Sequence, residues 1–178
     1  MNINEKISIL DGPMGTELDR RGSDTTLPLW SARALIENPE LVKSIHIDYI
    51  NAGAEIITTN TFRTQDRTIE TARLSNITGK ELTSQAVDLA KEARDVTKPC
   101  SIAGSIAPLE DCYSPDLVPS NLILRKEHPK MVKWLAENEV DIFLIETMNT
   151  FREGKIAFQK FQATLLMHRR HSKLILSR

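Results

Sequence analysis

Two acidic residues, Asp11 and Glu146, stand where buried strands would end, because Asp11 closes the run "ISILD" and Glu146 closes "DIFLIE". In parallel α/β proteins the carboxyl ends of the strands line the ligand site. Two carboxylates at that edge could hold a cationic group such as the ammonium of an amino acid. A single strand-terminal Asp is often only the cap of the next helix, but the pair favours binding.

A Gly-Pro-Met-Gly turn follows Asp11, and the next residues, Thr16 to Leu18, look like the first turn of a helix. The backbone amides of Gly15, Thr16 and Glu17, at a helix N-terminus, could bind a carboxylate. An ammonium site beside a carboxylate site predicts a pocket for a zwitterion.

Further polar residues follow two of the expected strands. The run "TTNT" includes Asn60 and Thr61, and "ETMNT" begins at Glu146. Trp30 is expected on a loop after the first helix. A lone Trp usually serves packing, but this one could form a wall of the substrate pocket.

The residues alone predict no metal ligand set. Cys100 is expected at the amino end of a strand, away from the site, and Cys112 has no partner at ligand spacing. We expect His46 and His128 at the surface or in an interface. Neither a Walker loop nor a Gly-x-Gly-x-x-Gly run is found, so nucleotide binding has little support.

Short β-rich runs alternate with helical patterns, which predicts an α/β fold with a mostly parallel sheet. The helical patterns lie in residues 38–53, 79–95, 128–141 and 149–168, with Gly53 as a stop for the first. The segment Ala107–Ser120 is expected to be a long functional loop. The expected strands are Ile7–Asp11, Glu55–Asn60, Cys100–Ile106, Asp141–Glu146 and Lys173–Ser177.

Two architectures fit this alternation. One is a five-stranded doubly wound sheet, and the other is an incomplete (β/α)₈ TIM barrel with about four βα units and the start of a fifth strand. Eight units at this spacing would need far more than 178 residues, so the barrel reading makes the chain incomplete. The pattern alone does not choose between them.

Composition predicts one globular domain over residues 1–178, with 40% hydrophobic and 26% charged residues. The net charge of -1 gives no indication of a nucleic-acid surface. No run is apolar enough to span a membrane, and the start does not resemble a signal peptide. With two cysteines, the cytoplasm is the expected compartment.

Four stretches in this order resemble the homocysteine S-methyltransferase family: "ILDGPMGTELDRRG", "LPLWSARALIENPELVKSIHIDYINAGAEIITTNTF", "SIAGSIAP" and "VDIFLIETM". The resemblance runs from about Ile9 to about Ala157. The tail, residues 158–178, matches loosely; it could be a fourth helix with the start of strand five, or a segment in a shifted reading frame. The resemblance implies a (β/α)₈ barrel that moves a methyl group onto the sulfur of homocysteine, giving methionine.

The resemblance also implies roles for individual residues. Asp11 and Glu146 would hold the homocysteine ammonium, and the Gly12–Thr16 turn, with Gly15, would meet the substrate carboxylate. Asn60 and Thr61 would line the pocket, and Trp30 would lie near the methyl donor. The donor would be S-methylmethionine, betaine or methyltetrahydrofolate.

Methyl transfer to a thiol also needs an activated sulfur, because a free thiol has a pKa near about 8.5. Binding to Zn²⁺ deprotonates a thiol. The family supplies three cysteine ligands from its sixth and eighth strands, and neither Cys100 nor Cys112 matches them. The resemblance therefore implies zinc in the family without a ligand set in this chain, whose catalytic residues stay unknown.

Three hypotheses follow. The chain is a truncated family enzyme that is inactive alone, a non-enzymatic remnant that self-associates through open sheet edges, or a doubly wound module that binds a small zwitterion.

Overall fold

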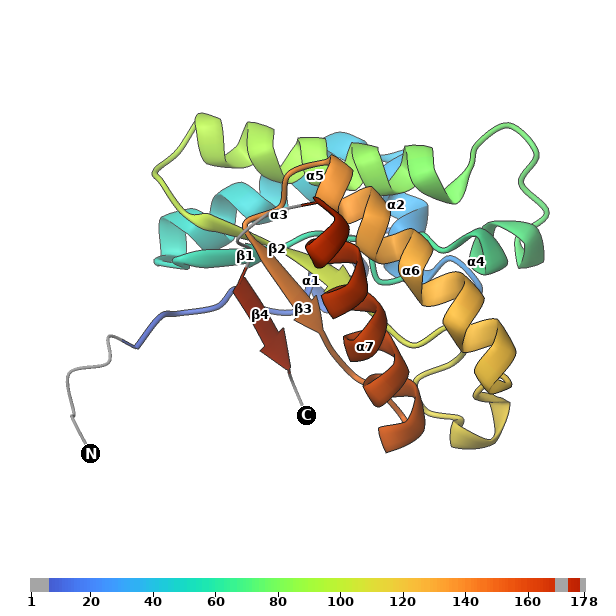
Figure 1. Ribbon diagram of the computed structural model, residues 1–178. Coiled ribbons are helices and arrows are strands. Elements are labelled where there is room, and N and C mark those ends of the chain that lie inside the picture. Colours follow the sequence, from blue (N-terminus) through green and yellow to red (C-terminus); the bar gives the residue numbers. More distant parts are fainter. Residues whose placement is uncertain (1–6, 169–172, 177–178) are drawn as a thin grey trace.

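The four strands of the sheet are parallel and follow one another in chain order. The computed structural model describes residues 7–168 and 173–176. Each strand pairs with the next along the chain, in the order β1-β2-β3-β4 (Figure 1). The strands are β1 (Ile56–Thr58), β2 (Ser101–Ile106), β3 (Ile142–Ile145) and β4 (Lys173–Leu176). Four of the five expected strands are thus confirmed, the first three of them at shorter bounds; Ser177, the expected end of the last strand, lies outside the described residues.

The expected first strand, Ile7–Asp11, is wrong as a strand. It makes a single parallel bridge, between Leu10 and Ile56, together with a hydrogen bond from the Asp11 N–H to the Ile56 carbonyl at 3.0 Å. Within the described residues, the backbone bonds of this segment to β1 and the residue before it come from Ile9 and Asp11 alone, which is too few for a strand. The segment nonetheless lies beside β1.

This position makes the whole order consecutive from the N-terminal segment to β4. A doubly wound sheet would have the order 2-1-3-4-5. The doubly wound alternative is therefore wrong.

Three of the four long helices form where the hydrophobic periodicity predicts them. The pattern at 128–141 is placed wrongly, since the helix there is Asn121–Glu137, which begins seven residues earlier and continues through Pro129. Asn38 caps α3 by accepting from the Leu41 N–H, and Gly53, at φ 113°, ends it. A capping box of Thr78 and Glu81 begins α5. The helices are α1 (Met14–Arg20), α2 (Arg33–Glu37), α3 (Pro39–Ala52), α4 (Asp66–Thr71), α5 (Gly79–Asp95), α6 (Asn121–Glu137) and α7 (Phe151–His168), with 3₁₀ turns η1 (Trp30–Ala32) and η2 (Pro115–Leu117).

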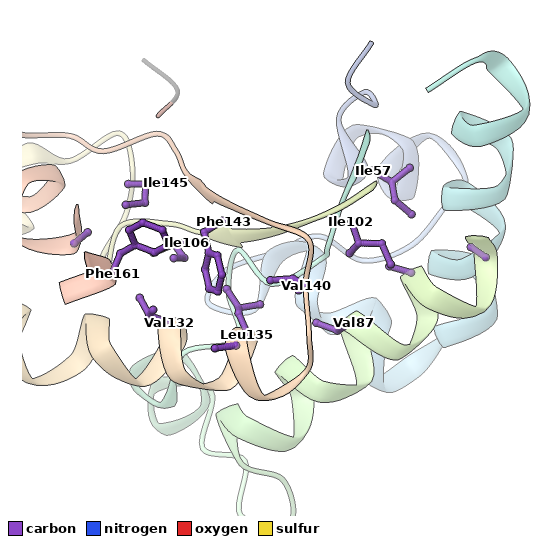
Figure 2. Close-up of a cluster of buried hydrophobic side chains, with 14 of the residues drawn as sticks. Ile57, Val87, Ile102, Ile106, Val132, Leu135, Val140, Phe143, Ile145 and Phe161 are labelled. Carbon is purple, nitrogen blue, oxygen red and sulfur yellow. The ribbon is translucent and has the colours of Figure 1, made fainter. Parts of the chain in front are cut away.

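The main core lies between one face of the sheet and the helices α3, α5, α6 and α7. Alternate strand residues such as Ile102, Ile106, Phe143 and Ile145 pack there (Figure 2). The residues between them in sequence, among them Ala103 and Leu144, point to the opposite face and form a small cluster made of strand residues. The two faces of the sheet therefore have different neighbours.

The expectation that His46 and His128 are surface or interface residues is wrong, since both are fully buried. His46 is four residues after Val42 and four before Ile50, and so lies on the buried side of α3. His128 on α6 contacts Glu153 on α7, with Nε2 and Oε1 3.2 Å apart. Helical spacing thus explains why His46 is buried. His128 can be buried because Glu153 is a buried polar partner for its ring.

Among residues 7–168 and 173–176, no helix combines the length and the apolar character needed to cross a membrane.

Candidate functional site

A cavity of about 340 Å³ lies at the carboxyl end of the sheet. Six of the site residues expected from the sequence line it: Asp11, Gly12, Gly15, Trp30, Asn60 and Glu146. The strand-end argument therefore led to the right part of the molecule.

Asp11 is held by Thr58, the last residue of β1. The Thr58 N–H donates to Oδ2 at 2.7 Å, and the Thr58 hydroxyl donates to Oδ1 at 2.9 Å. Burial raises the pKa of Asp11 to about 6, against these two hydrogen bonds, which lower it. Asp11 is therefore a carboxyl group that titrates just below neutral pH.

Glu146 is the first residue after β3, and it is held by Ser105 of β2. The Ser105 hydroxyl donates to Oε1 at 2.6 Å, and the Glu146 N–H donates to the Ile106 carbonyl at 3.2 Å. Burial raises the pKa of Glu146, while hydrogen bonds from Ser105 and Thr147 lower it. The backbone of β2 thus holds the backbone N–H of Glu146, and the Ser105 side chain of β2 holds its carboxyl group.

The two carboxyl groups line the same cavity. Burial is the main cause of the raised pKa of Asp11, and the charge of Glu146 adds a smaller contribution in the same direction. Neither group takes part in an ion pair among the described residues. A ligand cation in the cavity would relieve their repulsion and favour the ionised form of both. The arrangement can therefore bind an ammonium group.

The glycine turn brings the backbone close to aromatic rings. A Cβ atom on Gly15 would lie 2.4 Å from Cζ2 of Trp30, and one on Gly12 would lie 2.7 Å from the Tyr49 hydroxyl. The Trp30 ring meets Phe62 edge to face, with ring centroids 5.4 Å apart. Trp30 and Phe62 form an aromatic wall that only a residue without a side chain can approach this closely.

The turn differs from expectation in one detail. The N–H of Glu17 donates to the Pro13 carbonyl at 3.2 Å, so it is not available to a ligand carboxylate. The first amides of a helix have no partner within the helix, which leaves those of Gly15 and Thr16. The Thr16 side chain is exposed and lies outside the cavity lining.

Asn60 and Thr61 have different positions. Asn60 lines the cavity, and its side-chain amide donates to the Ser31 carbonyl at 2.9 Å. Thr61 is fully buried outside the lining, and its hydroxyl donates to the Ser105 carbonyl at 2.8 Å. Thr61 therefore supports the site from behind.

The lining residues that sequence reasoning missed include Phe62, Ser105, Cys112 and Tyr113. Ser105 had a usable signal, because strand alternation sets it on the same face as Ala103 and opposite to Ile106. The other three lie on connecting segments, where no periodicity operates.

The loop that carries Cys112 and Tyr113 is fastened to α7 and to the segment before it. The Asn149 side chain donates to the Asp111 carbonyl at 2.7 Å. The buried carboxylate of Glu153 accepts from the Leu109 N–H at 3.0 Å. These contacts hold the loop 107–120 over one side of the cavity.

The described residues do not offer a metal site. Within them, no group of three or more His, Cys, Asp or Glu side chains is arranged to hold a metal ion. Cys100 directly precedes β2 and Cys112 follows its far end, so the two thiols lie at opposite ends of the sheet.

The sequence model described as "Homocysteine S-methyltransferase" matches residues 8–176. The chain is 32% identical to the homocysteine S-methyltransferase of Escherichia coli strain K12, over 84% of this chain and 52% of that protein. It is 34% identical to homocysteine S-methyltransferase YbgG of Bacillus subtilis, over 83% of this chain and 52% of that protein. A selenocysteine Se-methyltransferase of Brassica oleracea is 31% identical, over 79% of this chain and 47% of that protein.

The fold also matches solved structures. The metallated form of the homocysteine methyltransferase MmuM from Escherichia coli superposes with a TM-score of 0.80 at 29% identity, covering 96% of this chain and 62% of that chain. The chain thus spans about half the length of the curated relatives that it matches.

Proposed function

The chain belongs to the homocysteine S-methyltransferase family, and from this premise we propose that its cavity binds homocysteine as the acceptor of a methyl group. The ammonium of the amino acid lies between the carboxylates of Asp11 and Glu146. The product of the transfer is methionine, with the methyl group on the sulfur.

The observation that carries the proposal is the pair of half-buried carboxyl groups in one cavity. Each is held by a hydroxyl from a neighbouring strand, Thr58 for Asp11 and Ser105 for Glu146. Holding two like charges together in a partly buried site is unfavourable unless a cation joins them. A substrate ammonium supplies that cation.

The other end of the substrate meets the turn from Gly12 to Thr16. Its carboxylate accepts from the amides of Gly15 and Thr16, which point out of the first turn of α1. Asn60 lines the pocket beside it. Trp30, with Phe62 against its ring, lies on the side of the methyl donor, which is S-methylmethionine, betaine or methyltetrahydrofolate.

The residues of this chain do not fit the zinc site that the family resemblance implies. The described part offers no group of metal-binding side chains, and Cys100 and Cys112 lie at opposite ends of β2. The proposal therefore assigns this chain substrate binding and orientation, and assigns it no step at the sulfur.

We further infer that the sheet is the first part of a (β/α)₈ barrel. Support comes from the consecutive parallel order, the helices packed on one face and the likeness to MmuM. The single domain over residues 1–178, the cytoplasmic location and self-association through open sheet edges stay predictions. The tail 158–178 contains the end of α7 and β4, and the family match extends to residue 176.

Calorimetry with three ligands tests the proposal under reducing conditions. L-Homocysteine is compared with γ-mercaptobutyrate, which lacks the ammonium, and with aminopropanethiol, which lacks the carboxylate. Homocysteine should bind at least about tenfold more tightly than either analogue, because each lost charged contact is worth about 1.5–3 kcal/mol. Equal affinity for homocysteine and γ-mercaptobutyrate would refute the ammonium site. Binding without methyl transfer from any of the three donors would fit a non-catalytic role for this chain.

A further inference from the structure

Ser105 donates its hydroxyl to Glu146 across two neighbouring strands. The Oγ to Oε1 distance of 2.6 Å is in the range of hydrogen bonds from a hydroxyl to an ionised carboxylate. Ser105 lies directly opposite Leu144 in the pairing of β2 with β3, two residues before Glu146. Strand alternation therefore brings the hydroxyl and the carboxyl group to the same face of the sheet.

The backbone of Ser105 is held from the other side by two threonines that follow β1. Its N–H donates to Thr59 Oγ1 at 3.2 Å, and its carbonyl accepts from Thr61 Oγ1 at 2.8 Å. The two threonine hydroxyls lie 2.9 Å apart. Because Thr61 has one hydroxyl proton and gives it to the Ser105 carbonyl, Thr59 is the donor to Thr61.

This network leaves Ser105 little freedom. Ser105, Thr59 and Thr61 are all at most 2% exposed, so water does not compete for their hydrogen bonds. The backbone polar groups of Ser105 are satisfied by the threonines, and its side-chain hydroxyl is directed to Glu146. The hydroxyl thus stabilises the charged form of Glu146 against the desolvation that opposes it.

A purely structural role would look different. A serine that only satisfies a buried strand donates to a nearby backbone carbonyl, whereas this hydroxyl is directed to a carboxyl group that lines the cavity. On the adjacent strand β1, the Thr58 hydroxyl likewise donates a hydrogen bond to the Asp11 carboxylate. Both carboxyl groups therefore have a hydroxyl partner on a neighbouring strand.

We propose that Ser105 is a positioning residue that fixes the orientation of Glu146 and keeps its carboxylate ionised for the substrate ammonium. The part about the ammonium rests on the proposed function. Thr59 and Thr61 hold Ser105 in register for this task.

The test replaces Ser105 by Ala in the full chain and follows the Glu146 carboxyl carbon by NMR during a pH titration. Glu146→Gln identifies the signal. The pKa of Glu146 should rise by about one unit, because about 1.4 kcal/mol of preference for the ionised form is lost. The matched control is Ser84→Ala, which removes a 2.8 Å hydroxyl bond to Asn138 between α5 and α6 and should leave the titration unchanged.

Calorimetry at pH 7 then measures how the substitution changes ligand affinity. In Ser105→Ala the affinity for L-homocysteine should fall about tenfold, while the affinity for γ-mercaptobutyrate should not change. If Ser105→Ala does not fold, Ser105→Cys keeps the packing with a weaker donor and should raise the pKa of Glu146 to a smaller extent.

The two ideas fail separately. A folded Ser105→Ala chain in which Glu146 titrates as in the wild type would overturn the positioning role. A raised pKa of Glu146 in that variant, with no homocysteine binding by the wild type, would support the hold of Ser105 on Glu146 and overturn the proposed function.

Discussion

Thr58 holds both carboxylate oxygens of Asp11, Oδ2 through its backbone N–H at 2.7 Å and Oδ1 through its hydroxyl at 2.9 Å. Two donors from one residue fix the plane of the carboxylate. Since Thr58 ends β1 and Asp11 lies beside it, the orientation of Asp11 depends on the pairing between the N-terminal segment and β1.

Replacing Asp11 by Asn should weaken homocysteine binding about 10- to 100-fold, because the substrate ammonium loses one of its two charged partners. Calorimetry at pH 7.5 measures the loss. Asp19→Asn on the exposed side of α1 is the matched control and should bind like the wild type. Unchanged affinity in Asp11→Asn would remove this residue from the ligand site.

Homocysteine affinity should fall about tenfold between pH 7 and pH 5. The pKa of Asp11 is about 6, so most of this carboxyl group is ionised at the higher pH and protonated at the lower one. Binding isotherms across this range give the midpoint directly. Asp11→Asn should have a flatter profile, and an equally steep profile in that variant would assign the proton to another group.

His46 should make the protein more stable as the pH rises from about 4 to 6.5. Burial lowers its pKa from 6.5 to about 4, so in this window the unfolded chain binds more protons than the native state. The contribution is lost as the pH falls and amounts to about 2 kcal/mol between pH 8 and pH 5.

Urea unfolding of the wild type and His46→Leu at pH 5 and pH 8 isolates this contribution. The variant should gain stability relative to the wild type at the lower pH. Asp11 acts in the opposite direction, because its pKa in the native state is raised above its ordinary value of 3.8, so the stability that it contributes falls as the pH rises to about 6. The comparison therefore uses the difference between the two proteins at each pH, in which Asp11 cancels. If the stability difference between the wild type and His46→Leu is the same at both pH values, His46 is not the source of the pH dependence.

Two glycine-to-alanine changes should have opposite effects. A Cβ atom on Gly15 meets the Trp30 ring at 2.4 Å, so Gly15→Ala must displace the aromatic wall, lowering stability by about 1–3 kcal/mol and weakening ligand binding. On Gly154 in α7 the nearest atom is Met148 Cβ at 3.5 Å, an ordinary contact. Gly154→Ala should stabilise the protein by about 1 kcal/mol. Urea unfolding measures both, and equal effects would contradict the close approach at Gly15.

Removing the buried carboxylate of Glu153 should cost about 3 kcal/mol of stability. Glu153→Ala leaves the Leu109 N–H and the His128 ring without their shared partner. Urea unfolding gives the loss, and hydrogen exchange at the Leu109 amide should become faster. Lys155→Ala, on the exposed side of the same helix, is the control. An unchanged exchange rate at Leu109 would mean that Glu153 does not anchor the loop 107–120.

Sequence reasoning worked where several local signals agree. The helix α3 has an apolar stripe, a cap at Asn38 and a stop at Gly53, and its bounds were predicted closely. The short helices α2 and α4 were not predicted, because fewer than two turns give no measurable periodicity. The Ile7–Asp11 run was predicted as a strand from its composition, but composition does not reveal that its pairing with β1 is limited to one bridge.

The candidate site divides in the same way. Asp11 and Glu146 could be predicted because strand ends converge at one edge of a parallel sheet. Other features depend on how α1 and the end of β1 are oriented. These are the exposure of Thr16, the burial of Thr61 behind the cavity lining and the hydrogen bond of the Glu17 amide within the turn. Phe62 and Tyr113 reach the cavity through the fold of their loops, which the sequence does not specify locally.

The alternation of side chains along β2 puts core residues on one face of the strand and cavity residues on the other. Ile106 faces the helices, and Ser105 faces the cavity. Substitutions on the cavity face can alter the ligand site while the residues on the helix face continue to secure folding. Deleting one residue within β2 would exchange the two faces of the strand for the residues beyond the deletion. The Ser105 hydroxyl would then face α6, and Ile106 would face the carboxylates. In this strand, the chain should tolerate replacement far better than a change of length.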